Sequence, residues 1–126
     1  MDIQKAAVIG HPIGHTMSPF IHERLSSLSG IPMGYRALDV PDLQAALPQL
    51  RQLDCFNITI PYKSAILPFL DGIDPAAAAF GSVNTVQVRE GKLYGYTTDG
   101  PGCRKALENH GLGFSSPVLL LGNGGA

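Results

Sequence analysis

The stretch NITIPYK, residues 57–63, gives the clearest indication of how this chain folds. Ile58 and Ile60 alternate with polar residues, which predicts a strand with its apolar side chains on one face. Pro61 cannot donate a backbone hydrogen bond to a sheet, so the strand should end there. Proline also suits the first position of a helix, and a helix is therefore predicted from Pro61 towards Leu70.

Lys63 would lie in the first turn of that helix, where a positive charge opposes the helix dipole at a cost of roughly 0.3–1 kcal/mol. Stability alone does not explain a lysine at this position. Polar side chains and a lysine after the carboxyl end of a strand are typical of a ligand site in an open α/β sheet. The stretch therefore predicts a binding site beside a strand-to-helix junction.

The composition indicates one globular domain. The chain has 126 residues, of which 44% are hydrophobic and 15% charged. Its net charge of −1 gives no electrostatic footprint for nucleic acid or an anionic membrane. The apolar runs are too short to cross a bilayer and the N-terminus lacks the apolar core of a signal peptide, so a cytoplasmic location is expected. Cys55 and Cys103 have no zinc or CxxC spacing and are predicted to be reduced, buried thiols.

Strands are predicted to alternate with helices along the chain. The predicted strands are residues 6–9, 35–40, 57–60, 83–88, 93–97 and 118–121. Helices are predicted to begin near Ser18, Leu43, Pro61, Asp74 and Gly100, and Pro48 should break or kink the second of them. Residues 89–92 would turn a hairpin. This pattern predicts an α/β fold, a three-layer sandwich with a mostly parallel sheet flanked by helices and including one hairpin.

Residues 122–126, GNGGA, follow the predicted buried strand 118–121 as a dinucleotide-binding turn would. A flexible tail is the plainer alternative. We expect a substrate domain over residues 1–113, followed by residues 114–126 as the linker, first strand and glycine loop of a Rossmann-type domain. Without partner strands, residues 118–121 could also pair with a second copy of the chain and form a homo-oligomer.

Several polar residues at strand and helix ends are candidates for a small-molecule site. The hydroxyls of Thr16 and Ser18 could hold a carboxylate or sugar-like hydroxyls, although a serine before Pro19 is equally suited to cap a helix. The Asn84 amide can donate to and accept from a substrate hydroxyl, or it can form a turn. These residue types predict binding of a small polar molecule.

Asp99 could cap a helix or could pair with Lys63 as an acid–base couple. A carboxylate near the ammonium favours the charged lysine, whereas burial favours the neutral one. His11 and His15 have the spacing of a metal pair, but Pro12 and Gly14 oppose a helix there and no third ligand is evident, so no metal site is predicted. His22 and His110 are expected on helix surfaces.

Four segments in order resemble the shikimate dehydrogenase family, specifically its N-terminal substrate-binding domain. They are residues 10–19, 57–63, 81–85 and 98–102. Residues 122–126 resemble the first half of the family's NADP-binding glycine loop. The resemblance covers essentially the whole chain but about the first half of a full family member.

The resemblance implies a protein that interconverts 3-dehydroshikimate and shikimate with NADP, a step towards chorismate and the aromatic amino acids. It implies that Thr16 and Ser18 hold the substrate carboxylate. Lys63 would exchange a proton with the substrate oxygen, and Asp99 would orient or share that proton. The implied ring-hydroxyl ligands are Thr59, Lys63, Asn84 and Asp99. The implied NADP contacts are Gly122, Asn123, Gly124, Gly125 and Ala126, an incomplete pocket, so the chain alone is expected to be inactive.

The sequence departs from the family at Thr16, where serine is usual. The added methyl group leaves quinate and aminoshikimate open as substrates, because one such group changes discrimination by only about 1–3 kcal/mol. A non-catalytic small-molecule binding module of shared ancestry is the alternative of a different class.

Overall fold

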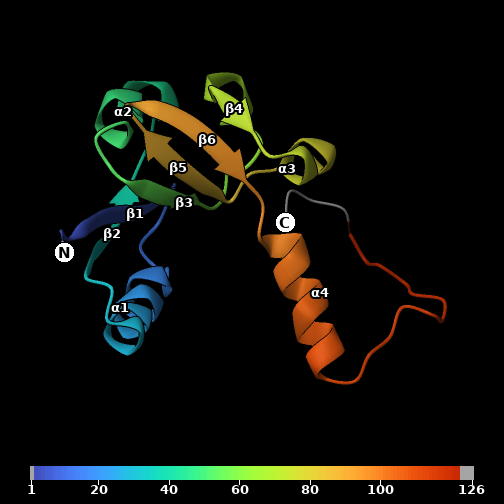
Figure 1. The fold of residues 1–126 in the computed structure, drawn as a ribbon. Coiled ribbons are helices and arrows are strands. Elements are labelled where there is room, and N and C mark those ends of the chain that lie inside the picture. The colour runs from blue at the N-terminus through green and yellow to red at the C-terminus, as the bar shows by residue number, and fades with distance from the viewer. Residues whose placement is uncertain (1, 123–126) are drawn as a thin grey trace.

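The computed structural model describes residues 2–122 and contains one six-stranded sheet with helices on both faces (Figure 1). The strands are β1 (Gln4–Gly10), β2 (Met33–Asp39), β3 (Cys55–Ile58), β4 (Gly72–Ile73), β5 (Thr85–Arg89) and β6 (Lys92–Tyr96). The α-helices are α1 (Ser18–Ser29), α2 (Leu43–Leu50), α3 (Pro75–Phe80) and α4 (Asp99–Asn109).

The strand order is β2-β1-β3-β5-β6-β4. Strand β1 pairs in parallel with β2 and β3, and β4 pairs in parallel with β6, whereas β5 is antiparallel to both its neighbours. Strands β5 and β6 form the predicted hairpin, in which Glu90 and Gly91 both have positive φ, as a tight two-residue turn requires. The α/β class, the mostly parallel sheet and the single hairpin are confirmed.

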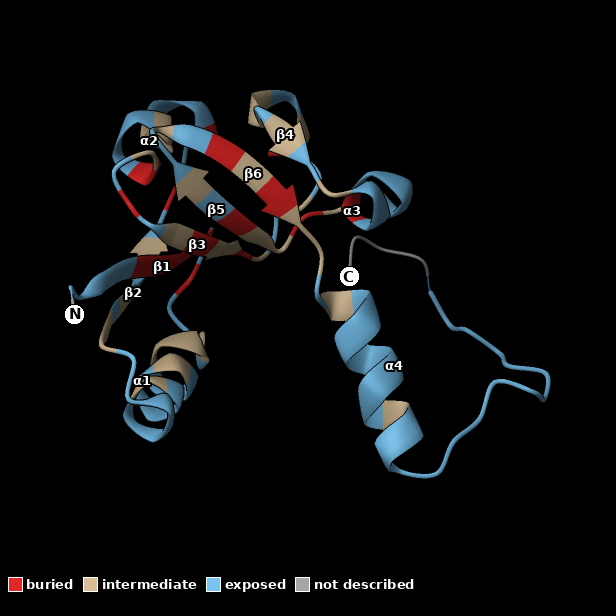
Figure 2. Ribbon diagram, viewed as in Figure 1, coloured by how far each residue is buried: buried red, intermediate tan, exposed pale blue. Residues whose placement is uncertain are grey.

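The main core lies between the sheet and α2. Ala7 and Ile9 of β1 and Phe56 and Ile58 of β3 point to this face by the two-residue alternation of strands, and all four are buried. From the helix side, α2 contributes Leu43 and Leu50. Figure 2 shows the buried residues concentrated along the middle strands. Helix α1 lies against the opposite face (Figure 1), but none of its residues is buried.

The region after β3 differs from the prediction. The strand ends at Ile58, and the Ile60 side chain is 75% exposed instead of sharing the face of Ile58. No α-helix follows Pro61: the chain makes successive turns and one short 3-10 helix, η1 (Leu67–Phe69). Pro68 accounts for this, because it has no N–H to donate within a helix and its ring clashes with the carbonyl four residues earlier. Lys63 therefore lies in a turn.

Three other local predictions are corrected. Helix α2 continues through Pro48 and ends two residues later, at Leu50. Residues 118–121 form no strand, because no strand among residues 2–122 pairs with them, and their exposed fractions run from 69 to 86%. Both cysteines are free, but Cys103 is exposed on α4, and Cys55 is half-buried, where burial raises the pKa of its thiol.

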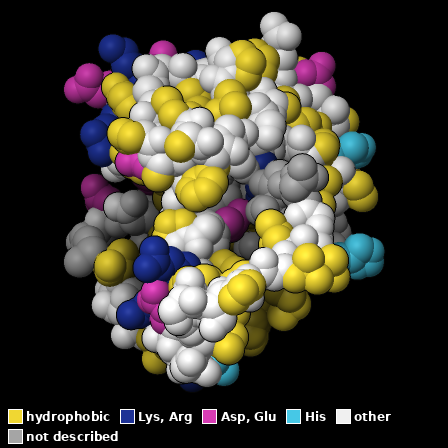
Figure 3. Space-filling view, turned by 90° about the vertical axis from the view of Figure 1, so that its right-hand side faces the viewer, with side chains coloured by type: hydrophobic (Ala, Val, Ile, Leu, Met, Phe, Trp, Pro, Cys, Tyr) yellow, Lys and Arg dark blue, Asp and Glu magenta, His cyan; other side chains and the backbone are white. Residues whose placement is uncertain are grey.

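Helix α4 extends away from the sheet (Figure 1), and of its residues only Asp99 and Leu107 are not exposed. Figure 3 shows this side of the molecule, where hydrophobic side chains lie around a hollow. Within residues 2–122, no helix combines the length and the apolar character needed to cross a membrane.

Candidate functional site

The candidate residues gather at the carboxyl ends of the parallel strands. Thr16 and Ser18 follow β1, Thr59 follows β3, and Asp99 follows β6. Strand β5 runs the other way, so its first residues, which Asn84 precedes, lie beside the end of β3. The topology therefore brings segments from four parts of the chain to one edge of the sheet, as expected for a ligand site in an open α/β sheet.

The turn that carries Lys63 is anchored from two sides. A Cβ atom on Gly10 would lie 2.6 Å from Cγ2 of Thr59 and 2.9 Å from the carbonyl oxygen of Ile60, so only glycine permits this close approach. On the other side, the buried Tyr62 hydroxyl donates to the carbonyl of Val40 at 2.5 Å. Position and direction of the turn are thus set by contacts with the ends of β1 and β2.

Lys63 and Asp99, 36 residues apart, meet in this site. The Lys63 Nζ lies 2.5 Å from Oδ2 of Asp99, with side chains that are 18% and 40% exposed respectively. The other carboxylate oxygen of Asp99 accepts from Nδ2 of Asn84 at 3.0 Å. Asn84 is itself held by Thr98, whose N–H donates to Oδ1 of Asn84 at 2.8 Å. Lys63, Asn84 and Asp99 therefore form one hydrogen-bonded cluster.

This cluster can carry out acid–base chemistry on a bound oxygen. The lysine has three donor hydrogens, and Asp99 uses one of them, so the ammonium can still reach a ligand. The carboxylate orients the ammonium and balances its charge, while the Asn84 amide fixes the carboxylate. A positioned donor of this kind can give a proton to a developing alkoxide or take one from an alcohol.

Thr16 and Thr59 form a second part of the site. Both line a cavity of about 370 Å³. The other lining residues are His11, Pro12, Ile13, His15 and Ile60. Ser18 joins them through its N–H, which donates to Oγ1 of Thr16 at 3.2 Å. His11 is engaged by a carboxylate, because its Nδ1 lies 2.9 Å from Oδ1 of Asp39.

The capping alternatives for Ser18 and Asp99 are wrong. Ser18 is the first residue of α1, preceded by Met17 as the N-cap residue, and the hydroxyl that accepts from the first turn belongs to Thr16. Asp99 is likewise the first residue of α4, after Thr98. Neither side chain is committed to capping a helix, and Asp99 is instead engaged by Lys63 and Asn84.

Sequence reasoning missed the polar residues beneath this site. Tyr35 donates to Asn57, and His22, expected on the helix surface, is partly buried with its ring stacked on that of Tyr35. Asn57 was an available signal, because an asparagine within a strand between buried residues needs hydrogen-bond partners. The register that brings it to Tyr35 could not be read from the sequence.

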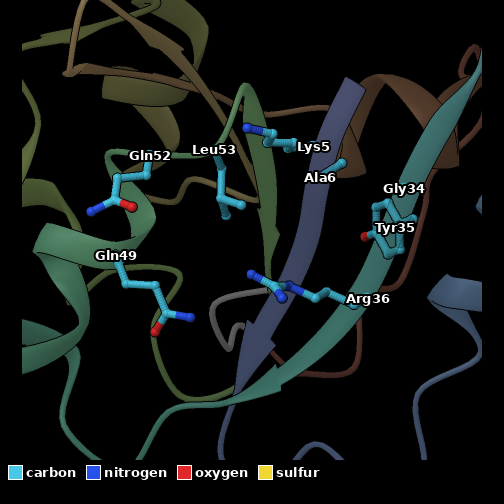
Figure 4. A pocket seen from close by; sticks show the side chains of 8 residues that line it. All are labelled: Lys5, Ala6, Gly34, Tyr35, Arg36, Gln49, Gln52 and Leu53. Atoms are coloured by element: carbon cyan, nitrogen blue, oxygen red, sulfur yellow. The ribbon is translucent and has the colours of Figure 1, made fainter. Parts of the chain in front are cut away.

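A larger cavity, of about 690 Å³, lies at the other end of the sheet. Lys5, Arg36, Gln49 and Gln52 line it, and Figure 4 shows the side chains of Arg36 and Gln49 extended towards one another. The two cations lie at the carboxyl end of α2, where the helix dipole favours positive charge. None of the described residues that line this cavity has a carboxylate. Its lysine therefore has no partner there like the one that Asp99 provides for Lys63.

Within residues 2–122, no cluster of three or more histidine, cysteine or acidic side chains has the arrangement of a metal site. Of the proposed NADP contacts only Gly122 is described, and its φ of 97° is one that glycine adopts readily. Asn123, Gly124, Gly125 and Ala126 lie outside the described residues.

Residues 8–86 match the family profile described as "Shikimate dehydrogenase substrate binding domain". The chain belongs to this family. A shikimate dehydrogenase (NADP(+)) of Exiguobacterium sp. AT1b is 46% identical over 124 residues, which are 95% of this chain and 47% of that protein. A Staphylococcus aureus MRSA252 enzyme of the same name is 42% identical over 97% of this chain and 47% of its own length.

Among solved structures of the shikimate dehydrogenase family, the Thermus thermophilus enzyme in complex with shikimate superposes with a TM-score of 0.92. It is 39% identical, and the match covers 98% of this chain and 49% of that one. The chain thus spans about half the length of the shikimate dehydrogenases it matches.

Proposed function

We propose that this chain is the substrate-binding part of an NADP-dependent shikimate dehydrogenase, which interconverts 3-dehydroshikimate and shikimate on the route to chorismate. The observation that carries this proposal is the Lys63–Asp99 pair, with its 2.5 Å contact at the carboxyl ends of the strands. Membership of the shikimate dehydrogenase substrate-binding family supports it. A pure binding module has no need of a lysine oriented by a carboxylate.

Each candidate residue has a role in this proposal. Thr16 and Ser18 hold the substrate carboxylate through their hydroxyls, which lie at the start of α1 where the helix dipole also favours negative charge. Thr59 and Asn84 bind ring hydroxyls. Lys63 donates to the oxygen that changes between ketone and alcohol, and Asp99 holds the ammonium of Lys63 in place.

The proton balance follows from the geometry of the pair. In the reducing direction, Lys63 Nζ–H donates its proton to the substrate oxygen as hydride reaches the carbonyl carbon, so the ketone becomes an alcohol and Lys63 becomes neutral. In the oxidising direction, neutral Lys63 takes the proton back. Asp99 holds the ammonium in position throughout. NADP(H), when bound, supplies or accepts the hydride.

The cofactor would be contacted by Gly122 and residues 123–126. The positive φ of Gly122 fits a tight glycine turn. In this proposal residues 1–113 form the substrate domain, and residues 114–126 begin the cofactor domain. These 126 residues by themselves are then expected to turn over no substrate, because they span about half the length of the shikimate dehydrogenases they match.

The proposal is tested in the whole protein that carries this chain, with shikimate, quinate and aminoshikimate as substrates and NADP and NAD as acceptors. We expect shikimate with NADP to give the highest kcat/KM. The proposal fails if shikimate is not oxidised, and a preference for quinate or aminoshikimate would instead indicate another member of the family.

The role of Lys63 is tested by Lys63→Ala in the same protein. Because proton transfer matters in the transition state, kcat should fall by about 100-fold to 10,000-fold while KM changes far less. Lys105→Ala, which removes an exposed lysine on α4, is the matched control and should leave both constants unchanged. A large rise in KM with normal kcat would make Lys63 a binding residue only.

A further inference from the structure

Tyr35 lies half-buried between α1 and the sheet, outside every set of residues assigned above to the substrate. Its ring stacks on the His22 ring, with centroids 3.9 Å apart and planes 5° from parallel. Nδ1 of His22 in turn donates to the carbonyl of Ser18 at 2.9 Å, which fixes the ring against α1. The Tyr35 hydroxyl donates to Oδ1 of Asn57 at 2.7 Å.

The Asn57 carboxamide is fully used by its neighbours. Its Nδ2 donates to Oγ1 of Thr85 at 3.0 Å and to the backbone carbonyl of Asn84 at 3.3 Å. A carbonyl can only accept, so Nδ2 must face Asn84 and Oδ1 must face Tyr35. The Tyr35 hydroxyl supplies the donor that Oδ1 of Asn57 needs in this orientation.

The network continues from Asn84 into the Lys63 site. The backbone of Asn84 is held by Asn57 and by the N–H of Ile58, while its side chain donates to Oδ1 of Asp99 at 3.0 Å. Asp99 then holds Lys63. A continuous series of hydrogen bonds therefore joins Tyr35 to the pair that would move the proton.

Stability alone does not explain a polar network at this position. Two apolar side chains of similar shape could replace a hydrogen-bonded pair here with nearly neutral effect on the free energy of unfolding. A fully satisfied network instead fixes one arrangement of its members. Burial raises the pKa of Tyr35 to about 12, so the phenol stays protonated and able to donate at neutral pH.

We propose that Tyr35 is a positioning residue for the Lys63–Asp99 pair, acting through Asn57 and Asn84. Its hydroxyl fixes the Asn57 amide, which holds Asn84 in register with the Asp99 carboxylate. The inference rests on the proposed function, because it assigns a consequence for catalysis to a contact that touches no substrate.

Tyr35→Phe is the decisive variant. It keeps the ring and its stacking on His22 but removes the donor to Oδ1 of Asn57. Oδ1 of Asn57 then loses its donor, so the amide is held only through Nδ2 and its contact with the carbonyl of Asn84 loosens. Asn84, and with it Asp99, would lose its fixed orientation. The matched control is Tyr94→Phe, since the Tyr94 hydroxyl, also half-buried, has no hydrogen-bond partner within residues 2–122.

In the whole protein, we expect Tyr35→Phe to lower kcat for shikimate oxidation about fivefold to tenfold, with KM within twofold of the parent value. Tyr94→Phe should leave both constants unchanged. A purely structural role would lower the amount of folded protein and leave the kcat of the folded fraction intact. Unchanged kcat in folded Tyr35→Phe, or an equal loss in Tyr94→Phe, would overturn the proposal.

A second readout separates this inference from the proposed function. The side-chain amide proton NMR signals of Asn84 should move in Tyr35→Phe and stay in place in Tyr94→Phe. If the parent protein does not oxidise shikimate, the proposed function fails, while the Asn84 signals still report whether Tyr35 positions this residue. Unmoved Asn84 signals in Tyr35→Phe would overturn the positioning role even in an active enzyme.

Discussion

At the scale of single residues, the start of α1 shows how a hydroxyl is left available for a ligand. Thr16 accepts from the N–H of Ser18, so the Ser18 hydroxyl is not needed to cap the helix. The Thr16 hydroxyl thus stabilises the helix as an acceptor and can still donate its own hydrogen to a substrate, whereas the Ser18 hydroxyl has no part in capping. The roles of Thr16 and Ser18 can be distinguished by measurement, because removing each hydroxyl should change the free energy of unfolding by a different amount.

We predict that Thr16→Ala lowers the free energy of unfolding by about 0.5–2 kcal/mol, the usual effect of losing a capping hydroxyl. Ser18→Ala should cost less than about 0.5 kcal/mol. Chemical denaturation measures both, and Thr16→Ser, which keeps the hydroxyl, is the control. A larger loss for Ser18→Ala than for Thr16→Ala would contradict the arrangement seen here.

Residue identity predicted the Lys63–Asp99 pair but not the network beneath it. Each member of the pair follows a strand, and the carboxyl ends of parallel strands meet at one edge, so their encounter could be inferred. Tyr35 and Asn57 lie within strands, where a shift of one residue turns every side chain to the other face. That register is set by the packing of the whole sheet.

At the scale of elements, prolines were an uneven guide, because α1 and α3 have a proline at their start as predicted whereas Pro61 and Pro48 misled. Pro61 predicted the start of a helix, yet Pro68 a few residues later limits the segment to turns and the short η1 helix. Pro48, expected to break or kink α2, does not break it and lies in the last turn of that helix. The hairpin was predicted correctly, because positive φ at Gly91 is a local property of glycine.

Asp71, the residue before β4, connects that strand to β6 and to the end of α2. Its Oδ2 accepts from the N–H of Leu93 in β6 at 2.8 Å and from Arg51, the residue after α2, at 3.0 Å. The Leu93 N–H and then the Arg51 guanidinium hold the pKa of Asp71 below its ordinary value of 3.8. The unfolded chain therefore binds this proton more readily than the folded chain does.

We predict that the stability contributed by Asp71 is present at neutral pH and is lost as the pH falls below about 3.8, through the lower pKa of the folded state. Acid unfolding followed by circular dichroism should show a smaller loss of stability in Asp71→Asn than in the parent. Glu23→Gln, which removes an exposed carboxylate on α1, should leave the acid transition unchanged. An identical transition in Asp71→Asn would rule out this linkage.

At the scale of the whole molecule, a continuous apolar segment remains uncovered. Val118 to Leu121 are between 69 and 86% exposed. Composition correctly marked this segment as apolar, but burial depends on neighbours, and no strand within residues 2–122 pairs with it. Four adjacent exposed apolar residues are a surface that favours association with another chain.

We predict that the chain of 126 residues self-associates through this segment. Leu120→Asp should weaken the association at least tenfold, measured by sedimentation velocity over a range of concentrations. Leu28→Asp places the same charge on the exposed apolar face of α1 and should have little effect. If Leu28→Asp alone disrupts association, the contact belongs to α1 and not to the 118–121 segment.

Asp99 belongs at once to the proton-transfer site and to a helix that scarcely contacts the rest of the protein. It is the first residue of α4, whose remaining residues are almost all exposed. Because Asp99 is part of α4, a change in the direction of that helix would move the carboxylate that holds Lys63. Contacts made along α4 would therefore affect the orientation of the Lys63 ammonium through Asp99. Distant parts of the protein could be coupled to proton transfer in this way.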